Sequence, residues 1–117
     1  MTYDLIALCE RPPDTGTTLA AMHACGPDLR VNTVERGALV QLCTDDGAPL
    51  VTIEGARLVQ VPGEAQRLLG IDDDLPCPLW WVEVRATGLP DAPRIARRFA
   101  AALLSVTGGV SWSGRSL

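Results

Sequence analysis

Apolar and polar positions alternate most regularly from Leu79 to Ala86. Because the side chains of a strand point alternately to its two faces, Trp80 and the even-numbered positions after it share one face. Leu79 and the odd-numbered positions share the other face. The pattern therefore predicts a strand in which the adjacent tryptophans Trp80 and Trp81 point in opposite directions.

Shorter apolar stretches bounded by glycine, proline or aspartate predict the other strands. They are Tyr3 to Glu10, Leu29 to Glu35, Ala38 to Thr44, Leu50 to Glu54, Arg57 to Val61 and, as a brief edge strand, Val110 to Trp112. Arg36-Gly37 is expected to form a tight connection, and Asp45 to Pro49 a turn in which glycine relieves a positive φ. Several of the strands are therefore expected to be linked as hairpins.

The first helix is predicted after Pro13, where Asp14 or a threonine that follows it offers a capping oxygen. It carries Leu19, Met22 and His23 at helical spacing. It is expected to stop at Gly26-Pro27, because proline cannot continue a helix.

The last helix is predicted between Asp91, as its cap, and Gly108. One apolar stripe runs along it, at Ile95, Phe99, Leu103 and Val106. A third, short helix from Pro62 to Leu69 precedes an exposed loop from Ile71 to Pro78, which contains three consecutive aspartates.

The order of these elements predicts an α+β two-layer sandwich, with a mainly antiparallel sheet and the two longer helices on one face. A ferredoxin-like variant with one extra short helix is the expected topology. The chain has 117 residues, which favours one domain that spans residues 1–117.

Charge and apolar run length narrow the possible partners. Ten arginines and no lysine stand against 14 acidic residues, and a formal charge of −4 excludes nucleic acid as the expected partner. The N-terminus lacks a basic region, and the longest later apolar run, Phe99 to Leu104, is far below the ~20 residues that a bilayer requires. Four scattered cysteines with no Cys-x-x-Cys pair favour a reduced, cytoplasmic protein without membrane insertion.

Three short motifs have both a chemical and a structural interpretation. Asp14-Thr15-Gly16 matches the aspartic-protease triplet, but it follows two prolines rather than an apolar strand, and helix capping is preferred. His23 and Cys25 would begin a zinc site, but two positions on a helix point about 200° apart. The Asp72 to Asp74 run lacks the alternating ligands of a calcium loop. We therefore expect no metal and no cofactor.

Cys9 is the candidate for nucleophilic chemistry. It ends the first predicted strand before a helix N-terminus, where negative charge is favoured. Glu10 opposes thiolate formation, and a cysteine that packs as a small apolar side chain is the competing interpretation. A small thiol-dependent enzyme or a ligand-binding domain that uses the Cys9 to Thr18 loop is therefore the alternative function.

The face of Trp81 is the candidate interaction surface, because tryptophan and arginine are favoured at interface centres. The candidate interface residues are Trp81, Leu79, Arg85 and Gln41. Leu5 or Ile6, Thr52 and Gln60 are the other expected neighbours on that face. Two coverings of the indole remain open, namely another molecule or the chain itself, through the Asp72 to Pro78 loop or the segment with Trp112.

Several stretches together resemble an uncharacterised family of small actinobacterial proteins or N-terminal domains. They are Asp4-Leu5-Ile6-Ala7-Leu8, Gly26-Pro27-Asp28-Leu29-Arg30-Val31, Val40-Gln41-Leu42-Cys43, Leu58-Val59-Gln60-Val61-Pro62-Gly63-Glu64 and Trp80-Trp81-Val82-Glu83. The resemblance spans most of the chain and implies an association with type VII secretion gene neighbourhoods. It implies no activity, cofactor or catalytic residue.

The leading hypothesis is a non-enzymatic interaction, accessory or adaptor module that associates through its open sheet face. Its partner would be another protein or a further copy in a homo-oligomer such as a homodimer. A third hypothesis is an immunity or inhibitor protein, in which the Asp72 to Asp74 loop meets a basic partner.

Overall fold

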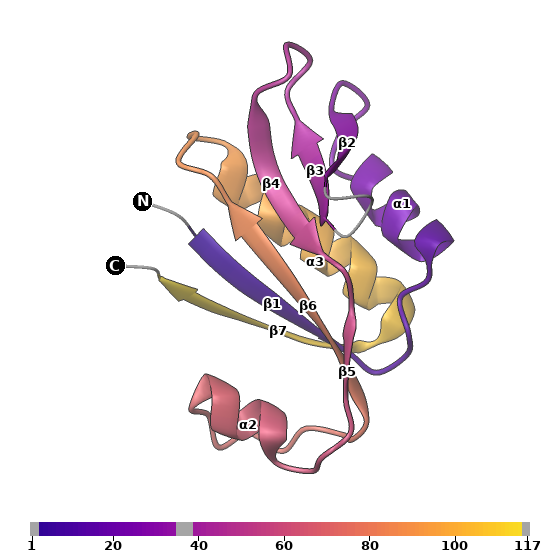
Figure 1. The fold of residues 1–117 in the computed structure, drawn as a ribbon, viewed down its shortest axis with the longest axis vertical. Coiled ribbons are helices and arrows are strands. Elements are labelled where there is room, and N and C mark those ends of the chain that lie inside the picture. Colours follow the sequence, from indigo (N-terminus) through magenta and orange to yellow (C-terminus); the bar gives the residue numbers. More distant parts are fainter. Residues whose placement is uncertain (1–2, 35–38, 116–117) are drawn as a thin grey trace.

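The computed structural model describes residues 3–34 and 39–115, which form an antiparallel sheet with helices on both faces (Figure 1). The strands are β1 (Tyr3–Cys9), β2 (Arg30–Val34), β3 (Leu39–Cys43), β4 (Pro49–Glu54), β5 (Arg57–Val59), β6 (Leu79–Ala86) and β7 (Gly109–Arg115). Six of them follow the order β2-β3-β4-β6-β1-β7, and β5 pairs with β6 beyond the end of β4. The predicted α+β class is confirmed, but this seven-stranded sheet is larger than the ferredoxin-like variant that the sequence suggested.

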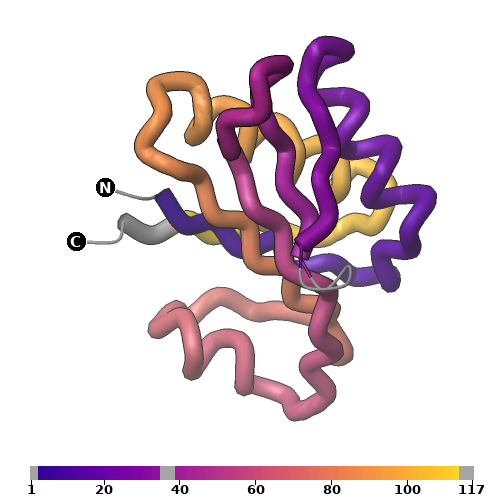
Figure 2. Tube along the Cα trace, turned by 45° about the horizontal axis from the view of Figure 1, so that its top comes forward, coloured from indigo at the N-terminus to yellow at the C-terminus, as the bar shows by residue number. Residues whose placement is uncertain are grey.

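Helices α1 (Thr15–His23) and α3 (Ala92–Thr107) cover one face of the sheet, and the short α2 (Glu64–Leu69) lies against the other. Figure 2 shows the chain around α2 as a lobe beside the main body. We call residues 60–78 the α2 lobe, and the sheet face on which it packs the open face.

The main core lies between the sheet and the two longer helices. Phe99 and Leu103 of α3 are buried there with Val82 and Val84 of β6, as the apolar stripe of α3 predicts. The last member of the predicted stripe, Val106, is 53% exposed. The stripe therefore reaches the sheet over most of α3 and leaves it in the last turn.

The first helix buries only part of the set of residues that the sequence placed at helical spacing. Ala21, Met22 and Cys25 are buried, whereas Leu19 and His23 are exposed. Cys25 lies against α3, where its thiol donates a weak hydrogen bond to the Ile95 carbonyl at 3.8 Å. Packing against α3 therefore orients α1, and of the three residues noted at helical spacing only Met22 faces the core.

Local signals placed the helix ends and turns well. Asp14 caps α1, since its carboxylate accepts a hydrogen bond from the Thr17 amide at 2.7 Å. Gly47 has a φ of 92° in the predicted turn before β4. The expected Arg36-Gly37 connection lies outside the described residues.

The C-terminal strand is longer than the sequence indicated. β7 pairs along all of β1, from Cys9 opposite Gly109 to Tyr3 opposite Arg115. The backbones approach closely at its start, because a Cβ on Gly109 would lie 1.9 Å from the Leu8 carbonyl oxygen. Glycine at this position therefore allows the edge strand to begin directly after α3.

Candidate functional site

The adjacent tryptophans of β6 do face opposite sides of the sheet. Trp80 packs against the main core, and Trp81 lies on the open face with Ile6 and Leu8. Trp81 is only 7% exposed, so its indole is not a free anchor for another molecule. The open-face position of Trp81 was therefore predicted correctly, and of the two coverings left open the structure shows the chain itself.

The α2 lobe provides that cover. Ala65 of α2 is buried against Trp81 and Leu79, and Leu69 and Leu75 pack around them. This small second core joins the lobe to the sheet. It explains why the lobe, which contains only six helical residues, lies on the open face.

A groove of about 550 Å³ remains between the lobe and the open face. We call it the open-face groove. Its sheet side is formed by Ile6, Trp81 and Trp112, and its helix side by Leu68 and Leu69. Arg57, Leu58, Val59 and Glu83 complete its lining. The groove therefore crosses β5, β6, β1 and β7, a width of about 14 Å at ordinary strand spacing.

An ion-paired network borders the apolar part of the groove. The Trp81 indole N–H donates to the Glu83 carboxylate at 3.3 Å, and Arg57 pairs with the same carboxylate oxygen at 3.3 Å. Further along the open face, Arg85 pairs with Asp4 at 3.1 Å. These ion pairs mark the border of the apolar surface, and the side chains of both arginines are largely exposed to solvent.

The four predicted interface residues share the open face but form no single site. Leu79 is buried beside Trp81, in the second core. Gln41, which donates to Thr52 at 3.4 Å, lies in a polar row with Arg85 because Thr52 pairs with both of them across the strands. Arg85 follows Trp81 by four residues on one strand, about 13 Å away. The apolar groove and the polar row are therefore two neighbouring surfaces.

Negative charge is in excess around the groove. Each of the three arginines there has an acidic partner, in the pairs Arg57–Glu83, Arg67–Glu64 and Arg85–Asp4. Glu54 and the exposed Asp72 to Asp74 run have no ion-pair partner among the described residues.

Glu54 of β4 lies beside Glu83 of β6, because the register of these two strands pairs the neighbouring residues Ile53 and Val84. A hydrogen bond between the two carboxyl groups, together with partial burial and mutual repulsion, raises the pKa of Glu54. The same hydrogen bond, helped by Trp81 and Arg57, lowers the pKa of Glu83. A positive charge brought to this position would relieve the repulsion.

Cys9 does not meet the conditions for a nucleophile. Its side chain is fully buried in the main core, and burial raises the pKa of the thiol against a smaller opposing effect of Thr107. An activated cysteine requires access and a lowered pKa. The structure therefore gives Cys9 a packing position.

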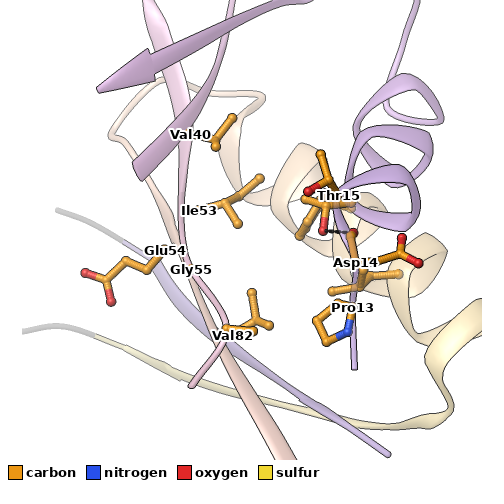
Figure 3. Close-up of a pocket in the computed structure, with 12 residues that line it drawn as sticks. Pro13, Asp14, Thr15, Val40, Ile53, Glu54, Gly55 and Val82 are labelled. Carbon is orange, nitrogen blue, oxygen red and sulfur yellow. Dashed lines mark hydrogen bonds between the residues drawn. The ribbon is translucent and has the colours of Figure 1, made fainter. Parts of the chain in front are cut away.

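A cavity of about 150 Å³ does lie beside the expected Cys9 to Thr18 loop (Figure 3). We call it the helix-side cavity, because it opens between the start of α1 and the end of β4. Pro13, Asp14 and Thr15 form one wall, and Val40, Ile53 and Val82 face them (Figure 3). Thr18 also lines the cavity. Phe99 and Leu103 complete its apolar interior.

The other motifs have structural positions. Asp14-Thr15-Gly16 begins α1, with Asp14 as its cap, and His23 is exposed near the end of that helix. Among the described residues no three metal-ligating side chains come together, and no helix there is long and apolar enough to cross a bilayer.

Comparison of the chain with protein-family models, curated proteins and solved structures found no match. The function of the site therefore has to follow from its own geometry.

Sequence reasoning missed Glu54, Arg57 and Leu68. The sequence did contain a signal for Glu54, because it shares a strand face with Thr52. It also contained one for Leu68, because Leu68 and Leu69 are adjacent on a short helix and cannot both face the sheet.

Proposed function

We propose that this protein is a non-enzymatic interaction module whose open-face groove binds a short amphipathic segment of a partner protein. The segment presents apolar side chains to the groove and arginine or lysine side chains to its rim. The observation that carries this proposal is a mainly apolar groove, with two tryptophans in its lining, bordered by a lobe that contains the exposed Asp72 to Asp74 run.

Apolar exposure supports the docking surface. Leu68 is 54% exposed and Leu58 is 46% exposed, at the two sides of the groove. Burial of apolar side chains that line one concave surface contributes more binding free energy than burial of an isolated surface leucine, because the partner removes all of them from water together. Trp112, the half-buried tryptophan of the lining, belongs to a residue type that is enriched among those that dominate binding energy.

Charge supports the choice of partner. The Asp72 to Asp74 run belongs to the α2 lobe that borders the groove, and Glu54 lies against the lining residue Glu83; none of these four carboxyl groups has an ion-pair partner among the described residues. Their negative field speeds the approach of a basic segment and disfavours an acidic one. A second copy of this chain carries the same excess of negative charge, so a basic partner fits better than self-association.

Peptide binding tests the proposal directly. The probe is an 18-residue amphipathic peptide of leucine and lysine, and its matched control replaces each lysine with glutamate. Titration calorimetry at two salt concentrations should show binding of the leucine–lysine peptide that weakens with salt. Equal binding of the two peptides would remove the basis for a basic partner.

Matched variants locate the binding surface. Leu68→Gln should weaken peptide binding about tenfold or more, the effect of losing one central apolar contact. Val106→Gln alters a side chain of nearly equal exposure on the helix-covered side and should leave binding unchanged. Equal effects of the two variants would place binding outside the groove.

A second pair of variants tests the charge. Neutralising Asp72, Asp73 and Asp74 to asparagine should weaken binding more than neutralising Asp28, Asp45 and Asp91, which are also exposed and change the net charge equally. Light scattering on the unliganded protein completes the test. If the unliganded protein is a dimer and Leu68→Gln dissociates it, the groove binds a second copy of this chain and not a basic partner.

A further inference from the structure

We propose that the helix-side cavity is a binding site for an uncharged, ring-sized molecule that carries a hydroxyl group. This site is separate from the open-face groove, because the sheet lies between them. Four properties of the cavity support the proposal, namely its size, the origin of its empty space, its hydrogen-bonding wall and its lack of inward-facing charge.

The size and the apolar lining of the cavity indicate a ligand with a single apolar ring. The cavity holds about 150 Å³, and apolar cavities of about this volume accept a benzene ring. Val82, Phe99 and Leu103 are at most 3% exposed, so the cavity reaches the main core. Water that enters finds few hydrogen-bond partners on these side chains, and an apolar ring would replace it favourably.

The sequence explains why the described segments beside this space do not fill it. The first turn of α1 reads Thr15-Gly16-Thr17-Thr18, and the first long side chain, Leu19, is exposed. On the opposite side, Gly55 and Ala56 separate β4 from β5 and contribute only small groups. These two segments, among the described residues, therefore contribute no side chain long enough to close the opening.

The threonine wall sets the polar group. Thr18 lines the cavity, and its hydroxyl donates its proton to the Asp14 carbonyl at 2.9 Å. Having used its proton, this hydroxyl oxygen offers lone pairs to a further donor. A ligand hydroxyl can donate to it, whereas an ether of the same size cannot.

Charge sets the third requirement. Asp14 and Glu54 carry the only ionisable side chains among the twelve lining residues described, and Figure 3 shows both carboxylates directed away from Ile53 and Val82. The Asp14 carboxylate already accepts from the Thr17 amide. An anionic ligand would meet repulsion at the opening, and a cationic ligand would lose its water without an inward-facing partner. The cavity therefore favours a neutral compound.

Amide chemical shifts measured by NMR test the site with three probes, namely phenol, anisole and benzoate. Phenol should shift the amide signals of Thr15, Thr18, Gly55 and Ala56 in a saturable way, with a Kd on the order of 1 mM for so small a ligand. Anisole and benzoate should bind at least about tenfold more weakly. No saturation by phenol, or equal binding of benzoate, would overturn the proposal.

Variants separate this cavity from other surfaces. Val40→Phe places a ring in the cavity from its half-buried wall and should weaken phenol binding tenfold or more. Val31→Phe makes the same change at an exposed position on β2 and should leave binding unchanged. Shifts that persist in Val40→Phe, or that follow the Trp81 and Trp112 indole signals, would place phenol elsewhere and contradict the site.

The hydroxyl contact has its own test. Thr18→Val keeps the shape of the side chain and removes the acceptor, so phenol should then bind no better than anisole. Thr18→Ser should restore the preference. Thermal unfolding of each variant shows whether the protein is folded. A preference for phenol that survives in folded Thr18→Val would contradict the assigned hydrogen bond.

Discussion

The carboxyl groups of Glu54 and Glu83 lie side by side across β4 and β6 on the open face, close enough to share a hydrogen bond when one of them is protonated. Only a protonated carboxyl can donate this bond, and the opposite pKa shifts of the two groups assign the proton to Glu54. When both groups are ionised they repel each other, and Arg57 pairs with Glu83 and not with Glu54. The open face therefore carries a local electrostatic cost next to the groove.

Glu54→Gln should stabilise the protein at pH 7. The raised folded-state pKa of Glu54 means that protonation favours folding. That contribution is present below the unfolded-state pKa of about 4.3 and is lost as pH rises through the folded-state pKa. The amide donates to Glu83 without a charge, so melting temperature should rise by about 1–3 °C at pH 7 and little near pH 4. A gain of equal size at both pH values, or a similar gain from Glu10→Gln, would contradict this assignment.

Trp81→Ala should destabilise the protein much more than Trp112→Ala. The Trp81 indole is buried between the sheet and Ala65, whereas Trp112 is half-buried at the edge of the groove. Removing a buried tryptophan costs about 3–5 kcal/mol of unfolding free energy. Urea denaturation of the two variants measures the difference, and similar losses would show that Trp81 does not hold the α2 lobe.

Gly109→Ala should be strongly destabilising. The new Cβ would lie 1.9 Å from the Leu8 carbonyl oxygen, so β1 and β7 must separate at their junction. Gly47→Ala is the matched control, because its φ of 92° also favours glycine but nothing lies within 4 Å of the new Cβ. The control should lose about 1 kcal/mol. A Gly109 variant as stable as the Gly47 variant would contradict the close approach.

Native protein should incorporate one iodoacetamide label, at Cys77. This cysteine is exposed, whereas Cys9, Cys25 and Cys43 are buried. Burial raises the pKa of Cys9 and of Cys25, which lowers their thiolate content further. Intact-mass measurement after brief labelling should show one adduct in the native state and four in urea. Rapid labelling of Cys9 in the folded protein would return it to consideration as a nucleophile.

Local patterns predicted a large part of the fold because their signals are confined to a few neighbouring residues. The span Leu79–Ala86 was predicted in full, and the opposite directions of Trp80 and Trp81 followed from the two-residue repeat of a strand. The Asp14 cap and the apolar stripe of α3 through Leu103 were equally local. Each feature depends on bonds or faces within a single element.

The candidate site was predicted only in part. The sequence placed Trp81 on the face away from the long helices, but it left open what covers the indole. The sequence did not point to Glu54, because the residue that it lies beside, Glu83, is 29 positions later along the chain. No short-range pattern records that pairing, since strand order decides which side chains meet.

The sequence by itself determined which side of most elements is apolar, because hydrophobic periodicity is a property of each element. Only the tertiary structure decided which distant segment covers each apolar side. It turned α1 so that Met22 rather than Leu19 faces the core, and it folded the α2 lobe over Trp81. The physical reason is that burial is favourable against any well-fitting apolar surface, so the chain's topology selects among surfaces that the sequence pattern cannot distinguish.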